Sequence, residues 1–196
     1  MNTPAHLIFA ATAFARPGQR MVNAAALAGG LLPDLALYLM VGWALNVQDI
    51  PARVVFGEMY FSDRWQAVFA VDHSLPLWSL ALILALALRS APGIAFSGSG
   101  LLHLIFDFLL HHDDARRQFW PLSDGVFRSP VSYWDPQYYG HLAGSAEILV
   151  CLALSVLLWR RFREWPARGL IAAGMALELS PLVMWWMMFA GEITGM

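Results

Sequence analysis

Long apolar blocks separated by short polar segments dominate the chain. A helix of about 20 apolar residues crosses the hydrocarbon core of a bilayer, which is about 30 Å thick. Neither the alternation of a half-buried strand nor the narrow apolar stripe of a soluble helix describes these blocks. Five blocks are long enough, and they cover residues 21–45, 67–88, 92–110, 141–159 and 167–190. The pattern predicts an all-α fold, a polytopic transmembrane helical bundle in which residues 1–196 form a single integral membrane domain.

Two further segments complete this prediction. Residues 4–15 are apolar but too short to cross a bilayer alone, so we expect a half-helix or re-entrant element that packs against the bundle. Residues 111–140 contain several Pro, Arg, Asp and aromatic residues. Amphipathic rings favour the headgroup region of a membrane, so this segment is interpreted either as a structured lid on the membrane surface or as an interfacial anchor without chemistry.

Composition supports the membrane prediction and excludes other classes. The chain is 59% hydrophobic and only 13% charged, whereas soluble domains contain roughly 25% charged residues. All twelve basic residues are Arg, and against fourteen acidic residues they leave a net charge of −2. A nucleic-acid partner is therefore not expected. Membrane lipids are the expected partners. The single Cys151 excludes an intrachain disulfide and a Cys-rich zinc module.

The Arg residues also indicate an orientation. Seven of them lie in alternate connections between the blocks, which predicts that these connections are cytoplasmic. They are Arg16, Arg20, Arg89, Arg160, Arg161, Arg163 and Arg168. The segments 46–66 and 111–140 would then lie on the opposite side of the membrane. The sequence leaves the oligomeric state open.

Ionisable residues inside the predicted spans point to a metal site. An Asp at the centre of a membrane helix costs about 2.5 to 3.5 kcal/mol on insertion scales, so each one requires a reason. His103, Asp107 and His111 are spaced i, i+4, i+8 and share one face of a helix. Imidazole and carboxylate at this spacing can converge on one cation. The alternative is a polar stripe that hydrogen-bonds to neighbouring helices.

Other blocks contribute further candidate ligands. Asp34 follows Pro33 and the Gly29–Gly30 pair, which permit a close approach to the backbone. Of the adjacent Asp72 and His73, we expect His73 to face the site, with Asp72 as its orienting partner or an alternative ligand. With His6, four separate segments place His or Asp in apolar surroundings, a donor set that suits Zn²⁺, Mn²⁺ or Fe²⁺. Glu147 and Glu178 are expected to form hydrogen bonds between helices.

These residues resemble the motifs of the bacterial membrane-bound metal-dependent hydrolases (DUF457-like), a family that includes SOS-regulated inner-membrane proteins. That family shows an early His, then G-x-x-x-P-D-x-D, H-R-G-x-T-H-S and H-x-x-x-D elements, then W-P-x-S. The matching stretches here are AHLIFA, GGLLPD, DHS, HLIFD and FWPLSDGVFRSP. The resemblance implies a bacterial inner-membrane location and a zinc-type site related to phospholipase C-like hydrolases, with ligands at His6, Asp34, His73, His103 and Asp107.

The chain departs from the family motifs at two places. Leu35 and Ala36 follow Asp34 where the family has a second acid, and the stretch AVFAVDHS lacks the first His of the H-R-G-x-T-H-S element. Asp72 or His111 could substitute for the missing ligand.

The leading hypothesis is a divalent-metal hydrolase that acts on an ester or phosphoester of a lipid or small amphiphilic substrate. Asp72 or Asp113 would act as general base. Arg116, Arg117 or Arg128 would hold an anionic headgroup, or would only anchor the loop to lipid phosphates. Two alternatives are a transporter or metal-permeation protein, with Asp34, Glu147 and Glu178 along its path, and a non-catalytic scaffold.

Overall fold

The computed structural model describes residues 1–193, and the side chains of residues 1–180. Every regular element within this part of the chain is helical, which confirms the all-α prediction. The elements are α1 (Thr3–Phe14), α2 (Arg20–Asn46), α3 (Ala52–Val54), the π-helical η1 (Val55–Met59), α4 (Asp63–Asp72), α5 (Leu75–Ala87), α6 (Ala91–Leu110), the 3-10 helix η2 (Pro136–Tyr138), α7 (Gly140–Arg161) and α8 (Trp165–Ile193).

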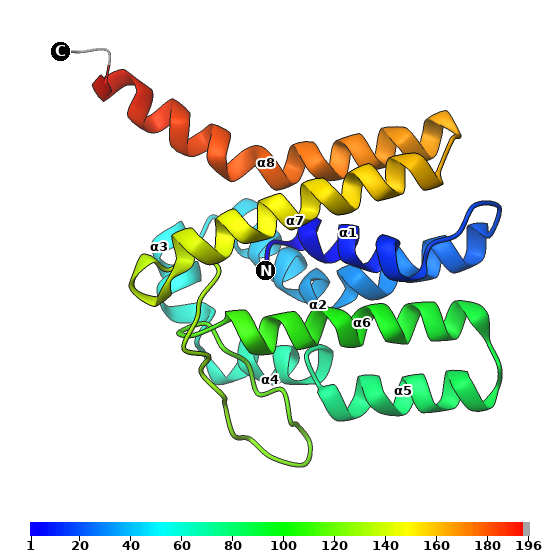
Figure 1. The fold of residues 1–196 in the computed structure, drawn as a ribbon. Helices are drawn as coiled ribbons and strands as arrows, with labels where there is room; N and C mark the ends of the chain where they lie inside the picture. The colour runs from blue at the N-terminus through cyan, green and yellow to red at the C-terminus, as the bar shows by residue number, and fades with distance from the viewer. Residues whose placement is uncertain (194–196) are drawn as a thin grey trace.

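The long helices lie side by side along a common direction, and successive ones run antiparallel (Figure 1). α2 packs against both α1 and α6, and α1 also contacts α6, α7 and α8. The short α1 is therefore surrounded by longer helices, as expected for an apolar element that does not cross a bilayer alone. The connections 15–19, 88–90 and 162–164 lie at one end of the bundle, and the segments 47–62 and 111–139 lie at the other (Figure 1). The connections with the Arg excess therefore share one end, although the side of the membrane that it faces stays a prediction.

Within the part of the chain that the structure describes, four helical segments are long and apolar enough to cross a membrane. They are α2, α4 together with α5, α6 and α7. Their outer faces carry large apolar side chains that no protein covers, among them Leu80 and Ile83 of α5 and Leu149 of α7. Apolar side chains on the outside and polar groups within are what a bilayer requires, so the fold is that of an integral membrane protein. The fifth predicted block lies in α8, whose side chains beyond residue 180 are outside the described residues.

The predicted span 67–88 is interrupted, which the apolar pattern alone did not predict. α4 ends at Asp72 and α5 begins at Leu75. Ser74 caps the new helix, because its hydroxyl accepts a hydrogen bond from the Leu77 N–H at 3.1 Å, and Pro76 occupies the first turn. The break leaves His73 at the end of α4 with no exposed surface. It therefore delivers an imidazole into the bundle.

Close helix contact at two glycines brings the polar residues together. A Cβ added to Gly29 would lie 1.9 Å from the Phe96 carbonyl oxygen, so α2 touches the backbone of α6 there. A Cβ on Gly30 would lie 3.3 Å from the His6 carbonyl oxygen, so α1 approaches α2 at the next position. Small residues allow this approach between membrane helices. It places Asp34, one turn further along α2, opposite α1 and α6.

The segment 111–139 folds back onto the end of α6 and onto the α4–α5 break. Tyr133 N–H donates to the Leu110 carbonyl at 3.0 Å, and Leu75 N–H donates to the Gln118 carbonyl at 2.8 Å. The Ser74 hydroxyl also donates to the Trp120 carbonyl. These bonds make the segment a structured part of the bundle end, and its function as a lid stays a prediction.

Candidate metal centre

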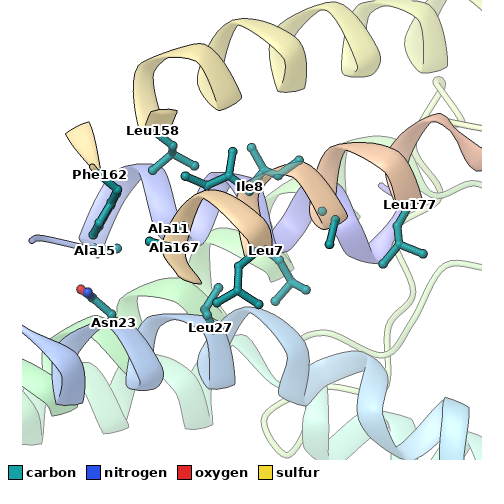
Figure 2. A pocket seen from close by; sticks show the side chains of 14 residues that line it. Leu7, Ile8, Ala11, Ala15, Asn23, Leu27, Leu158, Phe162, Ala167 and Leu177 are labelled. Carbon is teal, nitrogen blue, oxygen red and sulfur yellow. The ribbon is translucent and has the colours of Figure 1, made fainter. Parts of the chain in front are cut away.

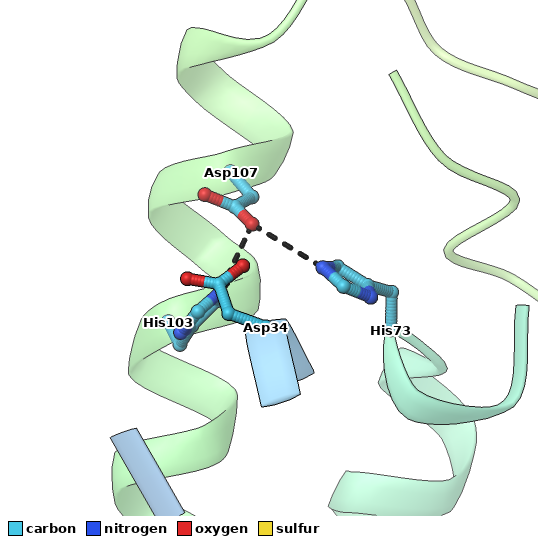
Figure 3. Close-up of side chains that lie close together, drawn as sticks. All are labelled: Asp34, His73, His103 and Asp107. Carbon is cyan, nitrogen blue, oxygen red and sulfur yellow. Dashed lines mark ion pairs between the residues drawn. The ribbon is translucent and has the colours of Figure 1, made fainter. Parts of the chain in front are cut away.

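Four His and Asp side chains from three parts of the chain meet inside the bundle. Asp34 comes from α2, His73 from the α4–α5 break, and His103 and Asp107 from α6 (Figure 3). One potential ligand atom of each lies within 4.8 Å of those of the others. The two imidazoles and Asp107 are buried, while Asp34 is partly exposed. Two imidazole nitrogens and two carboxylate oxygens are a donor set that can hold a divalent cation.

Both imidazoles are oriented by a partner on the nitrogen that faces away from the group. His73 Nδ1 lies 2.7 Å from Asp72 Oδ1, and His103 Nδ1 lies 2.8 Å from the Gly30 carbonyl oxygen. Both Nε2 atoms are buried and face the Asp107 carboxylate, and that of His73 has no hydrogen-bond partner in the described structure. Metal-binding imidazoles show this arrangement, in which the second nitrogen donates to a carboxylate or a carbonyl. The group therefore fits a cation better than it fits a closed hydrogen-bond network.

The two carboxylate oxygens of Asp107 face different pairs of imidazoles. Its Oδ2 lies 3.1 Å from His103 Nε2 and 3.6 Å from His73 Nε2. Its Oδ1 faces other imidazoles, with His6 Nε2 at 3.0 Å and His111 Nε2 at 3.1 Å. The His6 ring also stacks on His103, with ring centroids 3.5 Å apart. His6 and His111 thus lie outside the four-residue group. His111 contacts it through Asp107, and His6 contacts both Asp107 and His103.

His111, a predicted ligand, contacts two carboxylates at the end of α6. Burial disfavours its charged form, but Asp107 and Asp114 outweigh this effect and raise the pKa of His111 above its usual value. Asp114 Oδ2 lies 2.9 Å from His111 Nδ1 and also accepts from Trp134 Nε1. Burial opposes ionisation of Asp114, and these contacts nevertheless lower its pKa. Both ring nitrogens of His111 thus lie within hydrogen-bonding distance of a carboxylate, Nε2 of Asp107 and Nδ1 of Asp114.

The sequence interpretation missed two side chains near Asp34, namely Thr3, which donates to it, and Tyr38, which contacts Thr3. The Thr3 hydroxyl donates to Asp34 Oδ2, and the Thr3 and Tyr38 hydroxyls are 2.7 Å apart. Tyr38 lies one turn after Asp34 in α2, and Thr3 lies one turn before His6 in α1. The i+4 and i−3 spacings to candidate ligands are the signals that could have identified them.

The remaining candidates from the sequence lie at varied distances from the group. Asp72 contacts His73 Nδ1 and has no ligand atom in the group of four. Asp113 is largely exposed and lies nearest His112, at 3.7 Å. Arg117 Nη1 is 3.6 Å from Asp124 Oδ1, and Arg128 is exposed.

Two cavities adjoin the group. One, of about 460 Å³, is lined by Asp34, His111 and Arg116 together with Tyr and Trp side chains. The other, of about 750 Å³, is an almost entirely apolar groove between α2, α4, α5 and α6, and Asp72 is its charged residue. The first cavity thus reaches the group through Asp34, and the groove reaches only Asp72, the partner of His73.

Glu147 forms a link between helices. Its Oε1 accepts a hydrogen bond from the Asn2 N–H at 3.0 Å, which joins α7 to the start of α1. Glu178 of α8 is fully buried. The Glu147 bond agrees with the hydrogen bonding between helices expected for such residues.

Comparison with models of protein families, with curated protein sequences and with solved structures finds no match. The resemblance to membrane-bound metal-dependent hydrolases therefore rests on the short motifs alone. Within the described residues, several membrane-length apolar helices surround a buried His and Asp group that could hold a metal.

Proposed function

We propose that this protein is a membrane-embedded, metal-dependent hydrolase that cleaves an ester or phosphoester of a lipid or another amphiphilic molecule. The observation that carries the proposal is the convergence of the buried Nε2 atoms of His73 and His103 on two carboxylates, with one ligand atom of each residue within 4.8 Å of the others. A bound divalent cation would polarise the scissile group and lower the pKa of a water molecule toward about 7. Zn²⁺ suits this donor set best, and Mn²⁺ or Fe²⁺ also accept it.

Each residue of the site has a distinct part in this proposal. Asp34, His73, His103 and Asp107 would hold the cation, and Asp34 is the member of the group that also lines the polar cavity. Its carboxylate is therefore the ligand that borders the cavity in which a substrate would bind. Asp72, an alternative base in the sequence interpretation, would instead keep His73 in the tautomer that presents Nε2.

The amphiphilic character of the substrate is supported by the surroundings of the group. The apolar groove beside α4 and α5 lies among the membrane helices, where an acyl chain could be accommodated. Lipids of the surrounding bilayer are thus the expected partners. The bacterial inner membrane is the location that the motif resemblance implies.

Metal content is the first test. The protein purified in detergent should retain a stoichiometric amount of Zn²⁺, Mn²⁺ or Fe²⁺, and His103→Ala should lose it together with hydrolysis of a panel of lipid esters and phosphoesters. His141→Ala is the matched control, because His141 is exposed and outside the group. Undiminished turnover in His103→Ala would contradict the proposal.

The same samples separate the alternatives. A scaffold would contain no stoichiometric metal. A transporter would support metal uptake into proteoliposomes that depends on Glu147, whereas the hydrogen bond from Asn2 to Glu147 favours a structural place for that residue. Metal that stays bound through purification, without uptake, would support the hydrolase.

A further inference from the structure

Arg116, in the segment between α6 and α7, is a buried cation without an anionic partner. Only 5% of the residue is exposed, and its Nε and Nη1 atoms are buried without a hydrogen-bond partner in the described structure. No carboxylate among the described residues lies within ion-pair distance of it. Buried guanidinium groups are normally paired, because desolvation of an unpaired charge is strongly unfavourable. The buried guanidinium group of Arg116 is therefore a candidate to bind an anion.

Two aromatic rings hold the guanidinium group. The Arg116 Cζ atom lies 4.1 Å from the centroid of the Phe69 ring and 5.1 Å from that of Tyr60. Stacking engages the face of the guanidinium plane and leaves the N–H groups at its edge free to bind. Phe69 is itself fully buried in α4, so the cation is fixed to a rigid part of the fold. Its donors are thus oriented before any ligand arrives.

Arg116 shares its cavity with the metal group. The cavity of about 460 Å³ is lined by both Arg116 and Asp34. The acids in its lining already have partners, since Asp34 contacts Thr3 and His103, and Asp114 contacts His111 and Trp134. A ligand in this cavity would therefore meet both the guanidinium group of Arg116 and the carboxylate of Asp34.

We infer that Arg116 is the anion-binding residue of the site and that its ligand is the phosphoryl group of a phosphoester. A phosphoryl group has several non-bridging oxygens, so it can reach the metal group and still accept two hydrogen bonds from the guanidinium edge. The ester linkage of a carboxylic ester is neutral and would leave the Arg116 charge unpaired. The inference rests on the proposed hydrolase and narrows its substrate class.

Orthophosphate is the probe for this inference. The full-length protein, purified in detergent and loaded with Zn²⁺, should bind orthophosphate in calorimetric titrations. Arg116→Ala should bind it about 10- to 100-fold more weakly at unchanged metal content, because charge-assisted hydrogen bonds are lost. Arg116→Lys should fall between them, since it keeps the charge and loses the planar fork. Arg117→Ala is the matched control, because Arg117 is adjacent in sequence but does not line the cavity.

The outcomes separate the inference from the proposed function. Orthophosphate binding by Arg116→Ala or Arg116→Lys that equals the wild type, at normal metal content, would overturn the Arg116 assignment and leave the metal site intact. Equal binding of acetate and orthophosphate would overturn the phosphoryl assignment. A wild type without metal would instead contradict the proposed hydrolase. Arg116-dependent turnover of p-nitrophenyl phosphate, or of phosphatidic acid in mixed micelles, would support the inference and show whether the phosphoester is soluble or part of a lipid.

Discussion

Two regions along α1 are built on different principles. Around His6, imidazoles and carboxylates from four segments are held at hydrogen-bonding distances by specific partners. From Leu7 to Ala15, the same helix lines a cavity of about 280 Å³ between α1, α2, α7 and α8, and Asn23 is the one polar residue among the fourteen that line it (Figure 2). Dispersion contacts have no preferred direction, whereas a metal site requires specific angles and distances. The polar region should therefore tolerate substitution far less than the apolar one.

The backbone contact at Gly29 gives the sharpest test of this difference. Gly29→Ala would place a Cβ 1.9 Å from the Phe96 carbonyl oxygen, so α2 must move away from α6 and carry Asp34 away from His103. We expect a loss of about 3 kcal/mol in the free energy of unfolding, together with weaker metal retention. Denaturation in detergent and metal analysis measure both quantities.

Gly42→Ala in the same helix is the matched control for Gly29→Ala. A Cβ at Gly42 would meet no atom within 4 Å, so this variant should lose no stability and should gain about 0.5 to 1 kcal/mol from helix propensity. If the two variants behaved alike, the close approach of α2 and α6 would not be what positions Asp34.

Asp72→Asn should weaken the metal site without affecting the fold. The substitution removes the charge that orients His73 through Nδ1 but keeps the size of the side chain. Loss of such an orienting carboxylate typically costs 10- to 100-fold in metal affinity. Competition with a chelator of known affinity measures the change, and Asp124→Asn, at an exposed side chain, is the control. Unchanged metal affinity in Asp72→Asn would show that Asp72 does not orient His73 for metal binding.

The sequence predicted the membrane helices better than it predicted the contacts of the site. Apolar block length determines whether a helix can span a bilayer, and the i, i+4 spacing of His103 and Asp107 is a local property of α6. The break before Ser74 was not predicted, because local capping overrides an apolar run. The Gly30 carbonyl that orients His103 comes from another helix, so no motif around His103 could reveal it.

The Arg residues show the same limit. Arg116, Arg117 and Arg128 were equivalent candidates in the sequence, since the segment 111–140 has no periodicity from which the direction of a side chain could be inferred. Only the fold of that segment separates buried Arg116 from its neighbours. The residue type thus predicted that these Arg residues could bind an anion, but it did not predict which of them lies at the site.

The apolar cavity should give the smallest response. Gly174→Ala would place a Cβ 3.8 Å from Ile8 Cγ1, an ordinary van der Waals contact at the cavity wall. We expect a gain of about 0.5 to 1 kcal/mol in the free energy of unfolding, from helix propensity and added packing, with unchanged metal content. Gly169→Ala, where a Cβ would meet open space, isolates the contribution of propensity. Lower stability in Gly174→Ala would show that the apolar region is as sensitive to substitution as the polar one. Altered metal content would show that the two regions are coupled through α1, because a single methyl group at this position cannot otherwise affect metal content.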